Sequence, residues 1–419
     1  MANSLLKELL QPSVEQHEEE TTGYGIDTIE YASLEMAEVA SDLERHEQAV
    51  VELEEIAAGL ESIAESMEAS LEQGGMDPVA AQFAHHAVGA YTERLGMEAA
   101  DQLPALEAFG GDTGRQTSTQ VSLESVKERA AQIFEAIRRA IEAVIKAVGD
   151  FFTQFFSNAE KLGKAVEATI KKVDEAKGSP KGKVRVPNVD TIGFKGSAAI
   201  SEITKGIKAT DNVYKVMSGE YLDTVSKGQK ELAGLLSKNV SAETMEAFRS
   251  AFTRYSTWAK DMKQSADKAE GEVSGGRAIT VEVKGEGDSV ETEIKFDKVE
   301  GAKKIDNNEI DTPNAADLKA MLGAAKDLAG SLKASEGAVK KAMDAYREAA
   351  KAANDLAKDA KGGKLGEAWN NVKSKWLANR TSKNLVSPVQ RLSSHSWSVT
   401  RGAISVAEAS LKNYSEGDK

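Results

Sequence analysis

The sequence predicts a mainly α protein, built from a heptad-rich helical leader and an elongated helical-bundle body that carries one small β-hairpin. Three observations predict this fold. Only seven of the 419 residues are proline, Ala, Glu and Lys are abundant, and apolar residues recur at spacings of three and four over long stretches. The 41% hydrophobic content is enough for buried cores, and the length suits two or more domains.

A strongly acidic region, residues 1–107, comes first. It holds 24 Asp and Glu against three basic residues, a net charge of −21, so the rest of the chain must carry +7 to give the total of −14. An unbroken heptad pattern within it predicts one long helix that begins near Asp27 and pairs with another helix, in a hairpin or a coiled coil. The pattern comprises Met36, Val39, Leu43, His46, Val50, Leu53, Ala57, Leu60, Ala64, Met67 and Leu71.

A second helix of this region is predicted to fold back on the first. Gly74 and Gly75 end the heptad helix, and Asp77-Pro78 offers an N-cap followed by a favoured first helical residue. The apolar side of the second helix is expected to be formed by Phe83, Val88, Tyr91 and Leu95.

Residues 108–121 are rich in Gly, Thr, Ser and Gln, and we predict that they form a linker. An amphipathic helix is expected over 122–175, starting at the capping box of Ser125 and Glu128. It carries Phe151, Phe152, Phe155 and Phe156. We expect these rings to form the core of the body; the alternative is an amphipathic helix that lies on a membrane surface.

The remainder, residues 190–419, is predicted to be a helical body. Helices are expected near 197–237, 241–271, 314–361, 365–380 and 384–413. The apolar period changes to two at about 277–297, which predicts a β-hairpin, and residues 183–186 predict a short extended segment. Two strands are marginal alone, so the hairpin should lie on helices or pair with residues 183–186.

The sequence carries no enzyme signature, and we predict a protein that is not an enzyme and uses no cofactor, metal or small-molecule substrate. It has no cysteine. Its five histidines lack metal-ligand spacing, since His85 and His86 are adjacent and would point about 100° apart on a helix. The sequence has no apolar run of about 18 residues, so we expect no membrane-spanning helix. We also expect no secretory signal.

Two basic zones are candidate nucleic-acid contacts, because Lys and Arg neutralise phosphates without reading sequence. The first holds Lys171, Lys172, Lys177, Lys181, Lys183 and Arg185. The second, residues 368–407, has no Asp or Glu and holds Lys373, Lys375, Arg380, Lys383, Arg391 and Arg401. Trp369, Trp376 and Trp397 lie within it and could stack on bases; core tryptophans beneath a solvated helix face are the alternative.

Two copies of a small-x-Glu tripeptide flank the predicted linker, where chain cutting is expected if anywhere. They are Ala105-Leu106-Glu107 and Ser122-Leu123-Glu124. The same pattern occurs at residues 33–35, 66–68, 70–72, 165–167 and 241–243, mostly within predicted helix, where protease access is poor.

Together, these sequence features resemble those of a known protein family. An acidic, heptad-rich region that ends in PALEAFGG, followed by VSLESVKERAAQIFEAI and a helical body, is similar to the internal head proteins of large tailed bacteriophages, especially the giant phages. The resemblance covers residues 1–175. It implies a precursor that assembles with other prohead components, loses an acidic propeptide to the phage maturation protease, and stays inside the virion with the DNA. Carried onto this chain, it implies a cut after Glu107, with Glu124 as the second candidate.

On this interpretation the leader competes with DNA for the body, and its removal leaves a body of charge +7 that binds DNA weakly and non-specifically. Two alternatives stay open. One is a membrane-active or ejected effector that uses the Phe-rich helix. The other is a helical scaffold or adaptor that binds a partner, or a second copy of itself, through the heptads of residues 36–71.

Overall fold

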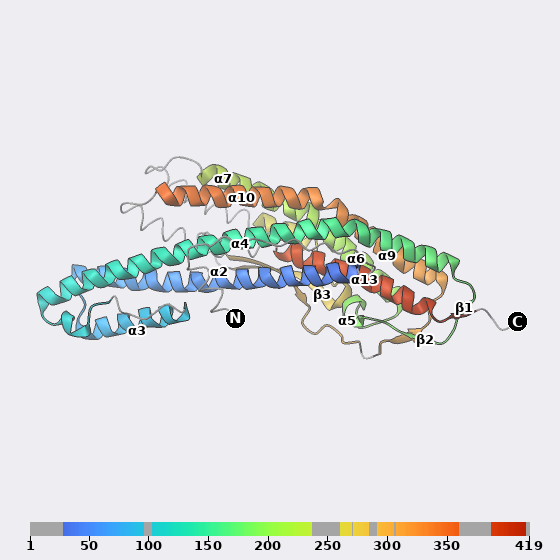
Figure 1. Cartoon of the computed structure of the whole chain (residues 1–419), viewed down its shortest axis with the longest axis horizontal. Coiled ribbons are helices and arrows are strands. Elements are labelled where there is room, and N and C mark those ends of the chain that lie inside the picture. Colours follow the sequence, from blue (N-terminus) through green and yellow to red (C-terminus); the bar gives the residue numbers. More distant parts are fainter. Residues whose placement is uncertain are drawn as a thin grey trace. The chain divides into compact units, whose positions relative to one another are not determined.

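The computed structural model describes residues 28–95, 103–236, 260–269, 271–284, 291–305, 307–359 and 387–415. This part of the chain is mainly helical, as predicted, and its strands form three two-stranded antiparallel sheets (Figure 1). It divides into two compact units. The first lies within Ser41–Lys146, and the second within Gly23–Ala40, Ala147–Asp359 and Arg380–Lys419.

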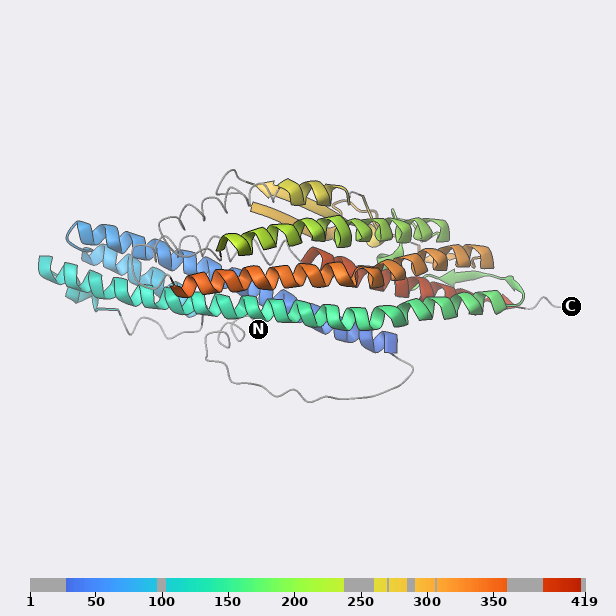
Figure 2. The same ribbon diagram turned by 90° about the horizontal axis from the view of Figure 1, so that it is seen from above.

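The first unit is built from three helices and one short 3₁₀ turn. Their bounds are Thr28–Glu72 for α2, Pro78–Arg94 for α3, Leu106–Phe109 for the turn η1 and Asp112–Glu175 for α4, whose later residues belong to the second unit. Within the first unit α2 and α4 lie side by side, as both ribbon views show (Figures 1 and 2).

The heptad residues of α2 form the core of this unit. An ion pair joins Glu68 near the end of α2 to Lys127 near the start of α4, so the two helices run antiparallel. On another side α3 folds back along α2, where Arg94 Nη2 lies 3.2 Å from Glu55 Oε2. The predicted helical hairpin is confirmed by the heptad residues buried here: Val50, Leu53, Ala57, Leu60, Ala64 and Met67.

The turn between α2 and α3 follows the predicted chemistry. Gly75, with a φ of 96°, lets the chain leave α2. Asp77 then caps α3, since its Oδ1 accepts from the N–H of Ala80 at 2.8 Å. One detail is wrong: Val88 and Leu95 are buried, but Phe83 is 72% exposed on the opposite side of α3.

The predicted linker at 108–121 and the helix start at Ser125 are also wrong, because α4 begins at Asp112. Gly111, with a φ of 75°, makes the turn just before it. Ser118 and Thr119 are then buried, and Thr119 Oγ1 accepts the N–H of Met76 at 2.8 Å. This tertiary contact outweighs the low helix propensity of Ser, Thr and Gly.

The second unit combines the rest of α4 with a bundle of further helices. α7 packs on α10, α6 on α9, and α13 on both α6 and α9. The bounds are β1 Ser179–Pro180, β2 Lys183–Arg185, α5 Val189–Ile192, α6 Ile200–Val216, the π-helical η2 Met217–Tyr221, α7 Leu222–Leu236, η3 Ser274–Gly276, β3 Arg277–Lys284, β4 Glu291–Lys298, β5 Glu309–Asp311, α9 Ala315–Ala334, α10 Glu336–Asp359, α13 Ser387–Leu411 and β6 Tyr414–Ser415. Residues 260–267 are also helical.

The four clustered phenylalanines are part of the core of this unit. Each is at most 6% exposed, and the ring centroids of Phe151 and Phe155 are 5.7 Å apart. Phe155 also lies 6.2 Å from the ring of Trp397 on α13. The core prediction is therefore confirmed. No helix within the described ranges has an apolar stretch long enough to cross a bilayer.

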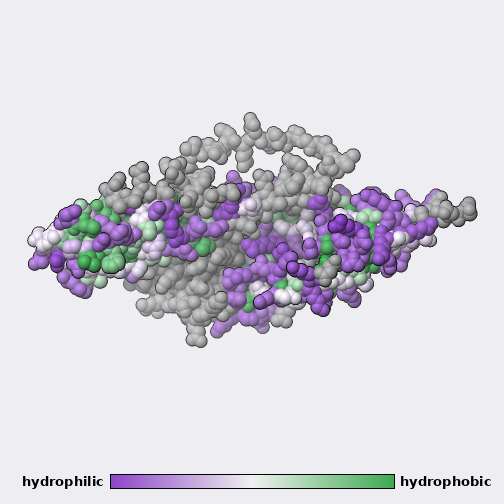
Figure 3. All heavy atoms as spheres, turned by 90° about the horizontal axis from the view of Figure 1, so that it is seen from below, coloured by the Kyte–Doolittle hydropathy of each residue, from purple (hydrophilic) through white to green (hydrophobic). Residues whose placement is uncertain are grey.

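Large hydrophobic side chains are seldom exposed, and the face in Figure 3 is mostly hydrophilic where residues are described. Among the described residues the exposed large hydrophobics are Val79, Phe83, Leu106 and Val121. All of them belong to the first unit.

The predicted β-hairpin is confirmed as β3 and β4, paired from Arg277 with Lys298 to Lys284 with Glu291. It lies on helix α13, as the 5.2 Å between the rings of Phe296 and His395 shows. The alternative pairing is wrong, because β2 pairs with the unpredicted strand β5.

Three predicted helices of the body are interrupted or lie wholly or partly outside the described residues. The helix expected over 314–361 is two helices, α9 and α10, which are interrupted at Ser335. The side-chain hydroxyl of Ser335 hydrogen bonds the hydroxyl of Tyr214 at 2.7 Å. The helix expected over 365–380 and most of the one at 241–271 lie outside the described residues.

Candidate processing turn and basic surface

The first small-x-Glu tripeptide lies in an exposed turn. Ala105, Leu106 and Glu107 are all exposed; Ala105 is the N-cap of the short 3₁₀ turn η1, and Leu106 and Glu107 are its first two residues. This turn is a single short 3₁₀ turn, whose backbone hydrogen bonds include those from Ala108 N to Ala105 O at 2.9 Å and from Gly110 N to Glu107 O at 3.2 Å. Since proteases bind extended chains, few bonds must break before the segment can enter an active site.

The chain just after Glu107 is anchored. Phe109 is fully buried, with its ring 5.9 Å from that of His85 on α3. The hydroxyl of Ser118 donates to the carbonyl of Ala108 at 3.0 Å. The bond between Glu107 and Ala108 therefore joins an exposed segment to a fixed one. The sequence pattern did not predict this anchor.

The second tripeptide is in a different environment. Ser122 and Leu123 are buried in the interior of α4, and only Glu124 is exposed. Helical hydrogen bonding and burial keep this segment out of reach of a protease in the folded chain. A cut after Glu124 would require the first turns of α4 to unfold.

The other tripeptides that the structure describes lie within helices. Their middle residues include Met67 in α2 and Val166 in α4, both at most 1% exposed, whereas Leu106 is 36% exposed. Residues 33–35 and 70–72 are helical, and 241–243 lie outside the described residues.

The first basic zone is exposed but partly neutralised. All six of its Lys and Arg side chains are exposed. Lys172 forms an ion pair with Glu408 at 2.9 Å. Lys183 and Arg185 of β2 face Asp311 and Glu309 of β5 as direct cross-strand partners. The other three residues of this zone are Lys171, Lys177 and Lys181, which have neither a cross-strand acidic partner nor an ion pair of this kind among the described residues.

The second basic zone is described only in part. Trp369, Trp376, Lys373, Lys375, Arg380 and Lys383 lie outside the described residues. On α13, Arg391 lies 3.9 Å from Asp297, and Arg401 is half-buried. Trp397 is 2% exposed in the phenylalanine core, so its predicted stacking on bases is wrong.

A family model for phiKZ-like phage internal head proteins matches residues 26–409, almost the whole chain. The chain belongs to this family. No curated protein and no solved structure matches it. An internal head protein is a structural component that lies inside the phage head, as the resemblance implied. The match includes the body beyond residue 175, in which the sequence pattern alone had shown nothing typical of the family.

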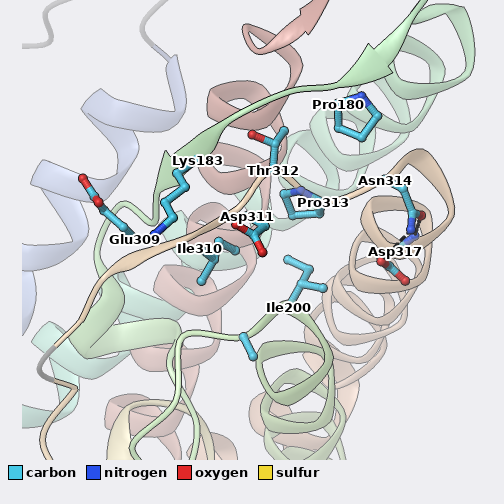
Figure 4. A pocket seen from close by; sticks show the side chains of 11 residues that line it. Pro180, Lys183, Ile200, Glu309, Ile310, Asp311, Thr312, Pro313, Asn314 and Asp317 are labelled. Atoms are coloured by element: carbon cyan, nitrogen blue, oxygen red, sulfur yellow. Dashed lines mark hydrogen bonds between the residues drawn. The ribbon is translucent and has the colours of Figure 1, made fainter.

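This internal head protein also has a shallow hollow beside strand β5 in its second unit, with a volume of about 590 Å³. Ile200, Ile310 and Asp311 point into it (Figure 4). Its charged lining comprises Lys183 with Glu309, Asp311 and Asp317, so carboxylates outnumber the one cation. The hollow therefore does not extend the basic surface, because its charge would repel phosphate.

His85 of the first unit has a structural environment. Burial first, and the neighbouring His86 second, hold the pKa of His85 below its ordinary value. A neutral ring suits its contact with Phe109. Within the described ranges, no group of three or more His, Asp and Glu side chains is placed to hold a metal ion.

Proposed function

We propose that this internal head protein is made as a precursor, and that the phage maturation protease cuts it after Glu107 during assembly of the head. The observation that carries the proposal is the exposed turn of residues 105–107. Among the described small-x-Glu tripeptides, this one lies between helices, with its middle residue partly exposed.

The charge distribution supports a role for the cut. The leader of residues 1–107 carries −21, and residues 108–419 carry +7. While it is attached, the leader repels DNA and competes with it for basic groups on the body. Its removal leaves a body that is retained by DNA weakly and in a salt-sensitive way.

Of the two alternatives, the membrane-active effector loses its main support, because all four clustered phenylalanines are buried. The scaffold alternative depended on a free heptad surface in the leader. Its heptad residues from Val50 to Met67 are already packed within the chain.

The test is the N-terminus of the protein recovered from mature heads and, in parallel, from proheads that lack protease activity. Intact mass and terminal peptide mapping should give a start at Ala108 in the mature heads and an uncut chain in the proheads. A full-length chain in mature heads would refute processing. A start at Ser125 would refute the assignment of the site.

A further inference from the structure

The part of α4 that lies in the first unit has a heptad pattern of its own. Eight residues follow one another at alternating spacings of four and three, and each is at most 7% exposed. They are Thr119, Leu123, Val126, Ala130, Ile133, Ile137, Ala140 and Val144. We refer to them as the α4 seam. Such a pattern is typical of a helix that packs in a coiled coil.

In the uncut chain, α2 of the leader lies alongside this part of α4 (Figures 1 and 2). The ion pair between Glu68 and Lys127 and the hydrogen bond from Met76 N to Thr119 Oγ1 fix α2 antiparallel to α4. Both contacts join a residue before Glu107 to a residue after it. The helix that lies alongside the α4 seam is therefore a segment that the proposed cut separates from it.

The two helices differ in their capacity to pair with a second copy of themselves. Residues 41–72 of α2 hold ten acidic residues and one basic residue, so two such helices repel each other. Residues 119–146 of α4 hold four acidic and five basic residues, which can pair in a self-complementary way. Charge therefore favours α4, rather than the heptads of residues 36–71, as the surface that meets another copy.

The buried side of α4 in this unit also carries polar groups that lack partners. The hydroxyls of Ser122 and Ser125 and the Nη1 of Arg129 are buried on α4 without a hydrogen-bond partner among the described residues. Buried polar groups that lack partners weaken the packing that buries them. Any of them that faces the leader regains water when the leader leaves.

We propose that cutting after Glu107 lets the leader dissociate, and that the α4 seams of two processed copies then pair, so that the processed protein is a dimer. The inference rests on the proposed function, since the natural trigger is the same cut. Before the cut, the covalent link holds the leader at a high effective concentration beside α4. After the cut, this advantage is lost and a second α4 can compete.

The test uses the full chain with the recognition sequence of a highly specific protease inserted between Glu107 and Ala108. Its outcome does not depend on where the phage protease cuts, so failure of the proposed function and failure of this inference are distinguishable. Analytical ultracentrifugation before and after cutting should show a monomer, and then a dimer of the 108–419 fragment with the leader free. A leader that stays bound, or a body that sediments as a monomer, would overturn the inference.

A matched pair of cysteine variants locates the contact, because the chain has no cysteine of its own. Ala130→Cys lies on the seam and Ala131→Cys on the exposed side of the same helix turn. Cys at 131 should react with a maleimide before and after cutting. Cys at 130 should be protected before cutting and protected again in the dimer. Rapid labelling at position 130 after cutting, at micromolar protein, would show a bare seam and refute the pairing.

Discussion

Glu107 and Glu124 have the same tripeptide context but opposite surroundings, and this contrast gives the most direct test at the scale of single residues. Glu107→Gln should block processing, because it removes the carboxylate that ends an exposed motif. Glu124→Gln should leave processing unchanged, because its motif is folded into α4. Intact mass of the protein from heads assembled with each variant decides the matter. A block by Glu124→Gln alone would place the cut in the second motif.

His395 predicts a pH dependence of stability. Burial first, and Arg277 second, lower its pKa to about 4, although its Nε2 hydrogen bonds the carbonyl of Ser274 at 2.9 Å. The unfolded chain therefore binds a proton near pH 6.5 that the folded chain does not accept. The contribution of the neutral His395 ring to the free energy of unfolding is fully present above pH 6.5 and is lost as the pH falls towards 4.

Urea unfolding at a series of pH values, for wild type and His395→Gln, measures this term. At about 1.4 kcal/mol per pKa unit, the maximum extra loss in wild type is about 3 kcal/mol. All other ionisable groups are common to the two proteins, so the difference between them isolates position 395. If the free energies of unfolding of wild type and His395→Gln fell by equal amounts from pH 7 to pH 4.5, the prediction would be wrong.

At the scale of elements, two adjacent glycines test how α4 is docked against the turn that follows α2. Gly74 and Gly75 both have a positive φ, 95° and 96°, which disfavours any other residue. A Cβ at Gly74 meets nothing within 4 Å, whereas at Gly75 it would lie 2.5 Å from the backbone carbonyl carbon of Arg115.

Gly74→Ala should therefore lower the free energy of unfolding by about 1–2 kcal/mol, through backbone strain alone. Gly75→Ala should lower it by a further ~2 kcal/mol, because the turn must also move away from α4. Urea denaturation of both variants gives the comparison. Equal losses would mean that α4 does not pack against this turn.

The elements differ in how well the sequence predicted them. α2 was predictable because its heptad residues are apolar over many turns. The start of α3 was predictable because Asp77 can cap a helix and Pro78 suits the first helical position. The start of α4 was not, because Ser118 and Thr119 become helical only through contacts with a distant turn. The three residues of β5 are too short to show an alternating pattern, so its pairing with β2 could not be foreseen.

The candidate processing site was also only partly predictable from the sequence. The tripeptide at residues 105–107 was visible in the sequence, but so were its other copies, and residue types alone do not rank them. Burial of Leu123, Met67 and Val166 now separates the first motif from three of the others. The predicted basic contacts behaved similarly: their Lys and Arg were visible, but the acidic partners of Lys172, Lys183 and Arg185 come from distant strands and helices.

At the scale of the whole molecule, charge predicts weak DNA binding by the processed body. Replacing Lys171, Lys177 and Lys181 with Gln should reduce the affinity and lower the salt slope by about 2–3, at roughly 0.9 per phosphate contact. The matched change of Lys183 and Arg185 to Gln should have a smaller effect, because Asp311 and Glu309 already face them. Fluorescence anisotropy with duplex DNA over a salt series measures both slopes. If each lysine or arginine removed changed the salt slope equally in both variants, the predicted difference between the two groups of residues would be wrong.

The anchored Phe109 has a consequence for the fate of the discarded leader. A cut after Glu107 leaves Phe109 as the second residue of the body, so α3 loses the ring that packs on His85, and α2 loses α4. If the proposed processing occurs, the tripeptides at 66–68 and 70–72, which are helical in the uncut chain, should then become substrates of the same protease. We expect digestion in a fixed order, with peptides ending at Glu68 and Glu72 appearing only after chains that start at Ala108. Fragments that small could diffuse out of the head and vacate volume for the incoming genome.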